Sequence, residues 1–229
     1  MRFSLPVFYL LGLMISFISS ADEFPVAPLS RVQTEPWGES FRLSNRNLEV
    51  IIHPESDGVV SLRKTQGNNL LNRPVTLLPG SPEDLTEALP RLDGVAQPRW
   101  QARGWISSEG SQTVLLTQTF GPPIHLRITH LLSLPQTGST LQWTTRFTAI
   151  APIDPLLPIT LILSAEAAQW EGLWKIENGP ELKTNLEQRQ QPDGLLVQQT
   201  LPDQAALQDL PPQGWTLVIE GSLSLPSPE

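Results

Sequence analysis

The segment "NLEVIIHPESDGVVSLRKTQGNNLL", residues 47–71, contains two apolar runs with a turn signal between them. In the first run, Leu48–Ile52, apolar side chains fill every second position, which is the period of a strand with one buried face. Pro54 cannot donate to a strand ladder and Asp57-Gly58 tolerates a positive φ, so the chain is expected to reverse direction there. The second run, 59–64, then returns alongside the first. The segment therefore predicts an antiparallel β-hairpin.

The same alternation continues beyond the hairpin. Four runs separated by Gly, Ser or Pro follow residue 98: RWQARGWISS, SQTVLLTQTFG, IHLRITHLLSL and STLQWTTRFTAI. Two more, LPITLILSAEA and GWTLVIEGSLSL, come later. Short breaks between alternating runs are typical of antiparallel meanders. Residues 72–98 predict a long connection with short elements, and helical pieces are expected only near 82–88 and 203–210.

These patterns predict an all-β fold, an antiparallel β-sandwich with few short helices, as a single domain over residues 22–229. Composition narrows the classes of function. The 229-residue chain has a formal net charge of −8, which argues against nucleic acid, since phosphates require basic partners. It contains no cysteine, which excludes disulfides, thiol catalysis and zinc–thiolate sites.

The start of the chain differs from the rest. Arg2 gives a short positive beginning, residues 5–18 are almost wholly apolar, and Ser19-Ser20-Ala21 are small residues suited to cleavage. This layout predicts a signal peptide over residues 1–21 and a periplasmic or secreted protein. The alternative is a membrane anchor, but 14 apolar residues are too few to cross a hydrocarbon core of about 30 Å. No membrane span is expected after cleavage.

The hairpin segment resembles the opening of galactose-mutarotase-like proteins, where a strand, a proline, a Gly-Gly turn, a second strand and a Gly plus Asn-Leu-Leu phrase follow one another. Here the turn is Asp57-Gly58, and the phrase is Gly67 with Asn69-Leu70-Leu71. With the long loop and Trp-containing strand that follow, the chain is similar to bacterial exported proteins of the DUF4380 family. The resemblance implies a supersandwich and a link to sugars. It does not extend to the mutarotase reaction, because none of the three histidines stands in that family's Asn-His-Pro/Ser type of motif.

Polar residues recur on one side of two neighbouring predicted strands. His125 and Arg127 share one face of the first strand, and Gln142, Thr144 and Arg146 share one face of the second. If the strands pair, these side chains form a patch that suits a glycan or an acidic group held by a bidentate arginine. The alternative is an ordinary solvated face of an antiparallel sheet.

Seven tryptophans against one tyrosine make stacking on a sugar a second candidate chemistry. Trp100, Trp105, Trp170 and Trp174 lie among polar residues and are expected to be exposed, where an indole packs on the C–H groups of a pyranose. The alternative for each is core packing, the usual role of tryptophan in a β-domain. Trp143 alternates with apolar residues and is predicted to lie in the core.

No motif for a metal, a phosphate loop or a nucleophile elbow is present, so neither metal nor cofactor is expected. His130 shares the apolar parity of its strand and is expected in the core or at a sheet edge. The favoured hypothesis is an exported carbohydrate-associated protein that binds a glycan without catalytic residues. Two alternatives stay open: a sugar-active enzyme, epimerase or lyase-like, that uses His125 or His53 with a glutamate, and a non-catalytic envelope scaffold.

Overall fold

The computed structural model describes residues 25–54, 58–71, 74–79, 99–121, 125–150, 159–165, 169–179, 181–182, 185–191, 194–200 and 214–225. Strands in these segments pair antiparallel throughout, so the predicted all-β class is confirmed. The predicted signal peptide and the two predicted helical pieces lie outside the described residues. Nowhere in the described segments does a helix have the length and apolar character needed to cross a membrane.

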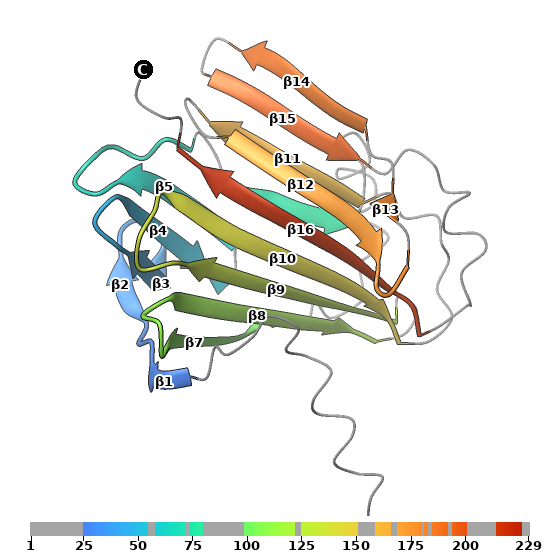
Figure 1. The fold of residues 1–229 in the computed structure, drawn as a ribbon, viewed down its shortest axis with the longest axis horizontal. Coiled ribbons are helices and arrows are strands. Elements are labelled where there is room, and N and C mark those ends of the chain that lie inside the picture. Colours follow the sequence, from blue (N-terminus) through green and yellow to red (C-terminus); the bar gives the residue numbers. More distant parts are fainter. Residues whose placement is uncertain are drawn as a thin grey trace, which may run out of the picture.

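The larger layer is a sheet of eight strands (Figure 1). In spatial order they are β1 (Pro25–Pro28), β7 (Gln101–Ser107), β8 (Gln112–Phe120), β9 (Leu126–Leu134), β10 (Thr140–Ala149), β16 (Thr216–Ser224), β12 (Gln169–Ile176) and β13 (Glu181–Leu182). From β7 to β10 the strands follow one another as a meander, as their short polar breaks predict. β16 then returns from the end of the chain and inserts between β10 and β12.

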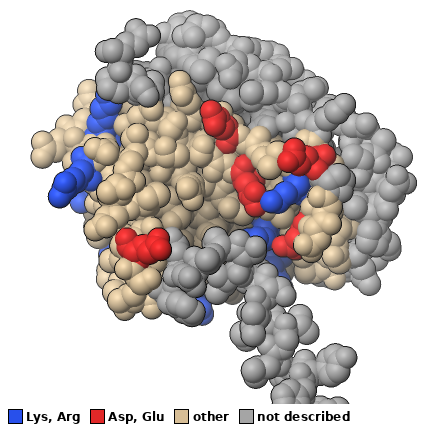
Figure 2. Space-filling view, viewed as in Figure 1, with Lys and Arg blue, Asp and Glu red and all other residues tan. Residues whose placement is uncertain are grey.

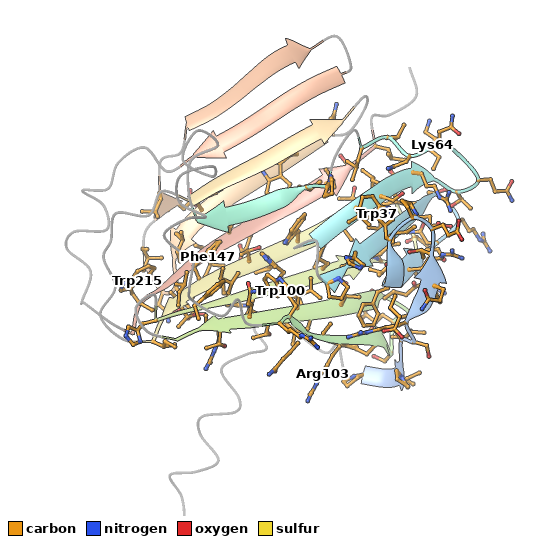
Figure 3. All side chains as sticks on the ribbon, turned by 180° about the vertical axis from the view of Figure 1, so that it is seen from behind. Trp37, Lys64, Trp100, Arg103, Phe147 and Trp215 are labelled. Atoms are coloured by element: carbon orange, nitrogen blue, oxygen red, sulfur yellow. The ribbon has the colours of Figure 1, made fainter. Side chains whose placement is uncertain are left out.

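Two four-stranded sheets complete the fold (Figures 1 and 3). One contains β2 (Val32–Thr34), β3 (Gly38–Ser44), β4 (Leu48–His53) and β5 (Gly58–Lys64); the other, in spatial order, contains β14 (Asn185–Gln191), β15 (Gly194–Thr200), β11 (Ile159–Ala165) and β6 (Thr76–Pro79). The Val75 amide donates to the Val59 carbonyl at 2.9 Å and links the two sheets. The result is a two-layered sandwich.

The hairpin predicted from residues 47–71 is present. β4 and β5 pair antiparallel, and Leu48, Val50 and Ile52 are fully buried, as their alternation predicts. The strand is more buried than a half-exposed one, because the register shifts between Ile51 and Ile52 and Ile51 is also buried, at 6% exposure. A bulge of this kind turns consecutive side chains toward the interior.

At two positions of the hairpin the local structure explains the residue that is present. Gly58 has a φ of 147°, and a Cβ there would lie 3.2 Å from the Trp143 ring, so a side chain would be both strained and crowded. The Asn69 side-chain oxygen accepts hydrogen bonds from the amides of Leu62 and Leu71, at 3.0 and 3.2 Å. The Asn69 side chain therefore provides a hydrogen-bond acceptor for the β5 backbone at Leu62, after the chain has left the strand.

The core lies between the larger sheet and the β2–β5 sheet. Residues of both layers contribute to one apolar cluster, in which Leu43, Leu62, Leu132 and Phe147 are wholly inaccessible to solvent. Polar links join the layers at one end: the Asn45 amide group donates to the carbonyl of Pro135 at 2.9 Å and to that of Gly138 at 3.1 Å. Burial of this apolar surface, at roughly 25 cal/mol per Å², stabilises a sandwich that has no disulfide.

Candidate functional site

The side of the eight-stranded sheet that points away from the core is mostly polar, and we call it the outer face. On β8, Val114 and Leu116 belong to the core, whereas Leu115 and Thr117 alternate with them. Because adjacent strands are paired residue to residue, the outward side chains form transverse rows. The four rows are Trp105, Thr113, Ser133, Gln142, Ser222 and Glu171; Arg103, Leu115, Leu131, Thr144, Glu220 and Leu173; Gln101, Thr117, Thr129, Arg146, Val218 and Lys175; and Thr119, Arg127, Thr148 and Thr216.

Four residues of the predicted polar patch lie on this face: Arg127, Gln142, Thr144 and Arg146. β9 and β10 pair, as the prediction requires, with Arg127 opposite Thr148 and Arg146 opposite Thr129. Arg127 and Gln142 are exposed, but they lie three row spacings apart along the strands, a distance of about 20 Å at strand rise. Arg146 lies 3.5 Å from the Glu177 carboxylate, Nε to Oε1. The patch therefore shares a face but does not converge on one small ligand.

His125 lies just outside the strand on which it was predicted to share a face with Arg127. β9 begins at Leu126, and His125 precedes it with a φ of 52°, in the left-handed region. Its amide donates to the Gly121 carbonyl at 2.9 Å, and its carbonyl accepts from the Ile150 amide at 3.0 Å. The main chain of His125 therefore closes a turn, and the parity rule that holds within a strand does not apply to its side chain.

A shallow, open depression of about 540 Å³ hollows the outer face over β10, β16 and β12. Figure 2 shows acidic side chains, with a few basic ones among them, gathered on this face over the region of β16 and β12. Its lining combines polar and apolar side chains, and two glycines, opposite each other on adjacent strands, contribute to it. The lining residues are Gln142, Trp143, Thr144, Glu171, Gly172, Leu173, Glu220, Gly221 and Ser222.

The floor of the depression is backed from inside by an indole ring. A Cβ built on Gly221 would lie 2.1 Å from Cη2 of Trp170, so only glycine lets the ring lie against this backbone. Trp170 in turn packs edge-on against Trp143, with ring centroids 6.1 Å apart. The depression and the tryptophan cluster are therefore opposite sides of the same stretch of sheet.

The charges around the depression are only partly balanced. Glu220 forms an ion pair with Lys175, Nζ to Oε1, at 2.8 Å. Glu171 belongs to none of the ion pairs found in the described part of the chain. It stands at the β12 end of a row that also contains Ser222 and Gln142. The row thus presents a carboxylate, a hydroxyl and an amide side by side.

The prediction that four tryptophans are exposed is wrong for two of them. Trp170 and Trp174 are 5% and 1% exposed, because their positions on β12 face the core. Trp100 is half-buried and packs against the core (Figure 3), with its ring centroid 5.1 Å from that of His130. Trp105 is also half-buried, but it stands on the outer face at the far end of the row that contains Gln142.

His130 lies in the core, as its parity predicts. Its Nδ1 is 2.8 Å from the Thr145 hydroxyl and 3.4 Å from Nε1 of Trp143, which donates to it. With Nδ1 accepting, the neutral ring carries its proton on Nε2, which has no hydrogen-bond partner among the described residues. Burial lowers the pKa of His130 from 6.5 to about 3. Trp143, predicted to be a core residue, is 1% exposed, which confirms that prediction.

Three polar residues of the depression were not identified as candidates from the sequence: Glu171, Glu220 and Ser222. A signal was present, because each follows or precedes a glycine inside a strand, in the phrases WEGLW and IEGSL. Glycine within a strand marks a close approach of another group to the backbone. Within the described segments no group of three or more His, Asp or Glu side chains is placed to hold a metal ion.

A comparison with protein-family models found no match, and a comparison with curated proteins also found none. The similarity to the DUF4380 family therefore stays a prediction that depends on the hairpin segment.

Proposed function

We propose that this is an exported carbohydrate-associated protein that binds a glycan at the depression on the outer face. The row of Gln142, Ser222 and Glu171 carries the proposal. Sugar hydroxyls both donate and accept hydrogen bonds, and this row offers both functions at a strand spacing of about 4.8 Å. A row of neighbouring polar groups on rigid strands suits a ligand with hydroxyl groups at regular intervals.

Apolar contact is available beside this row. Leu173, which is 39% exposed, lines the same depression, so a sugar can place its C–H face there while its hydroxyls reach the polar row. Ligand sites commonly combine such apolar surface with a few placed polar groups. The shallow, open form of the depression suits a segment of a longer glycan better than an enclosed small molecule.

The sugar link also follows from the galactose-mutarotase-like resemblance, with which the two-layered antiparallel sandwich is compatible. That support is an analogy of fold, and one fold hosts many functions. The export part of the proposal depends on the apolar segment at residues 5–18. The enzyme alternative would use His125 or His53 with a glutamate; the third histidine, His130, is buried in the core next to Thr145 and two tryptophans.

The test is binding of the full chain to a panel of purified polysaccharides and oligosaccharides, followed by thermal unfolding and by calorimetry. At a hundredfold excess over the dissociation constant, a ligand stabilises the fold by about 2.7 kcal/mol. Gln142→Ala should weaken binding about fivefold, the value of one hydrogen bond of about 1 kcal/mol.

Gln101→Ala is the matched control, since Gln101 is an exposed glutamine on the same face but on β7, outside the depression. It should leave the affinity unchanged. Absence of saturable binding to every glycan, or equal losses in the two variants, would overturn the proposal.

A further inference from the structure

The lining of the depression carries an excess of negative charge. Among the described residues that line it, the charged ones are Glu171 and Glu220. Lys175 neutralises Glu220 at 2.8 Å, whereas none of the ion pairs in the described residues includes Glu171. Glu171 is exposed on the outer face, opposite Ser222. One uncompensated carboxylate therefore faces any ligand that enters.

We infer that the depression selects a glycan that carries protonated amines, such as a polymer of glucosamine with free amino groups. The inference rests on the proposed function and names the class of sugar. A protonated amine has only donors, which match the acceptor oxygens of Glu171. An acidic sugar in the same position would bring a second negative charge beside this carboxylate and be repelled.

The row also fixes the orientation of such a sugar. Glu171 lies at the β12 end, while Ser222 and Gln142 continue the row across β16 and β10. An amine bound at Glu171 directs the neighbouring hydroxyls toward Ser222 and Gln142. These two groups, unlike a carboxylate, both donate and accept, so they accommodate hydroxyls in either role.

Basic residues without a partner lie elsewhere on the outer face. Arg103 and Arg127 are exposed on β7 and β9, and no ion pair in the described part of the chain includes either one. A glycan that carries carboxylates would therefore bind at that side of the sheet and not in the depression. The depression should favour a positively charged sugar, and the side with the arginines should favour a negatively charged one. This difference allows a direct test.

The experiment measures calorimetric affinity of the full chain for four oligosaccharides of equal length and linkage, made of glucose, glucosamine, N-acetylglucosamine or glucuronic acid. Glucosamine should bind about fivefold more tightly than glucose, the range of one charge pair partly exposed to solvent. Acetylation removes the charge and should abolish this advantage. The glucuronic acid oligomer should bind most weakly. The advantage of glucosamine should shrink as salt is added.

Two variants locate the effect. Glu171→Gln should abolish the preference, so that this variant binds the glucosamine and the glucose oligomers with equal affinity. Lys175→Gln should enlarge the preference, because it frees the Glu220 carboxylate. Glu109→Gln is the control, since Glu109 is exposed in the turn after β7 and its replacement changes the net charge equally, away from the depression.

The outcomes separate the two proposals. If glucose and glucosamine oligomers bind equally, the inference fails and glycan binding at the depression stands. If the glucuronic acid oligomer binds most tightly and Arg127→Gln weakens it, the inference is wrong and the ligand is acidic. If Glu109→Gln reduces the preference as much as Glu171→Gln, the effect comes from net charge and the inference is overturned. If no oligomer binds, both proposals are overturned.

Discussion

The two faces of the eight-stranded sheet hold polar contacts of the same length in different surroundings. On the inner side, Nδ1 of His130 lies 2.8 Å from the Thr145 hydroxyl, and both residues are wholly buried. On the outer side, Nζ of Lys175 lies 2.8 Å from Glu220, and both side chains are part-exposed. Water competes for the outer pair, whereas the inner pair is protected from water.

Alternation along the strands gives the two faces of the sheet different roles. The inner residues of β10 and β12 include Trp143, Trp170 and Trp174, which fill the sandwich. The outer residues of the same strands include Gln142 and Glu171, which line the depression. Stability is therefore expected to depend on the inner side and ligand recognition on the outer side. Substitutions in matched pairs across the sheet test this separation.

The largest difference between the faces should appear when Trp143 and Leu173 are each replaced by alanine. Trp143 is 1% exposed and contacts the rings of His130 and Trp170, so Trp143→Ala should lower the free energy of unfolding by about 3–5 kcal/mol. Leu173→Ala, at a part-exposed position, should change it by about 0.5 kcal/mol or less. Urea denaturation measures both values. Equal losses would refute the division between the faces.

Gly221 contributes to the depression on the outer face, and its backbone lies against the Trp170 ring on the inner face. Gly221→Ala would place a methyl group 2.1 Å from the Trp170 ring, and the overpacking should lower the free energy of unfolding by about 1–3 kcal/mol. Gly121→Ala is the control, since a Cβ at Gly121 has no heavy atom within 4 Å. Combining Gly221→Ala with Trp170→Leu should cost less than the sum of the single losses. Strict additivity in urea denaturation would show that the ring does not press on this backbone.

Burial of His130 makes the free energy of unfolding depend on pH. Its pKa is 6.5 in the ordinary state and about 3 when buried, so below pH 6.5 the unfolded chain binds a proton that the folded chain does not. Its contribution is complete above pH 6.5 and is lost progressively down to about pH 3. From pH 7 to pH 5 the free energy of unfolding should fall by about 2 kcal/mol through this residue.

The measurement compares urea denaturation at the two pH values for the parent chain and for His130→Gln, which should lack this part of the decrease. Both chains retain His53 and His125, whose contributions cancel in the comparison. Nuclear magnetic resonance of the parent chain gives an independent check, because the His130 ring should stay neutral at pH 5. A ring that titrates near pH 6.5 would contradict its burial.

The fold was largely predictable because the strands alternate and the breaks between them are short. Leu48, Val50 and Ile52 identify the buried side of β4 from sequence alone, and the parity of β9 places His130 in the core. The bulge between Ile51 and Ile52 was not predictable, because both residues are apolar and either one satisfies the buried side.

The candidate site was less predictable, and β12 shows the reason. Its phrase QWEGLWK has polar neighbours around both tryptophans, which led to the wrong prediction that they are exposed. Parity alone allows either set of alternate residues to face inward. Pairing with β16 decides which set faces inward, because Gly221 on that strand leaves space for the Trp170 ring. β16 lies 40 or more residues away in sequence. Such long-range fit leaves no local signal beyond the glycine itself.

The smallest expected effect concerns the outer ion pair. Lys175→Gln removes the 2.8 Å contact with Glu220, but the side chains are 32% and 46% exposed, so the free energy of unfolding should change by about 0.5 kcal/mol or less. Thr145→Val is the matched change on the inner face: it removes the 2.8 Å contact with His130 and should cost about 1–3 kcal/mol, because a buried acceptor loses a partner. Urea denaturation of both variants at pH 7 ranks the two contacts. If Lys175→Gln costs as much as Thr145→Val, the outer face is a structural element of the sandwich, and its charges are not free to serve a ligand.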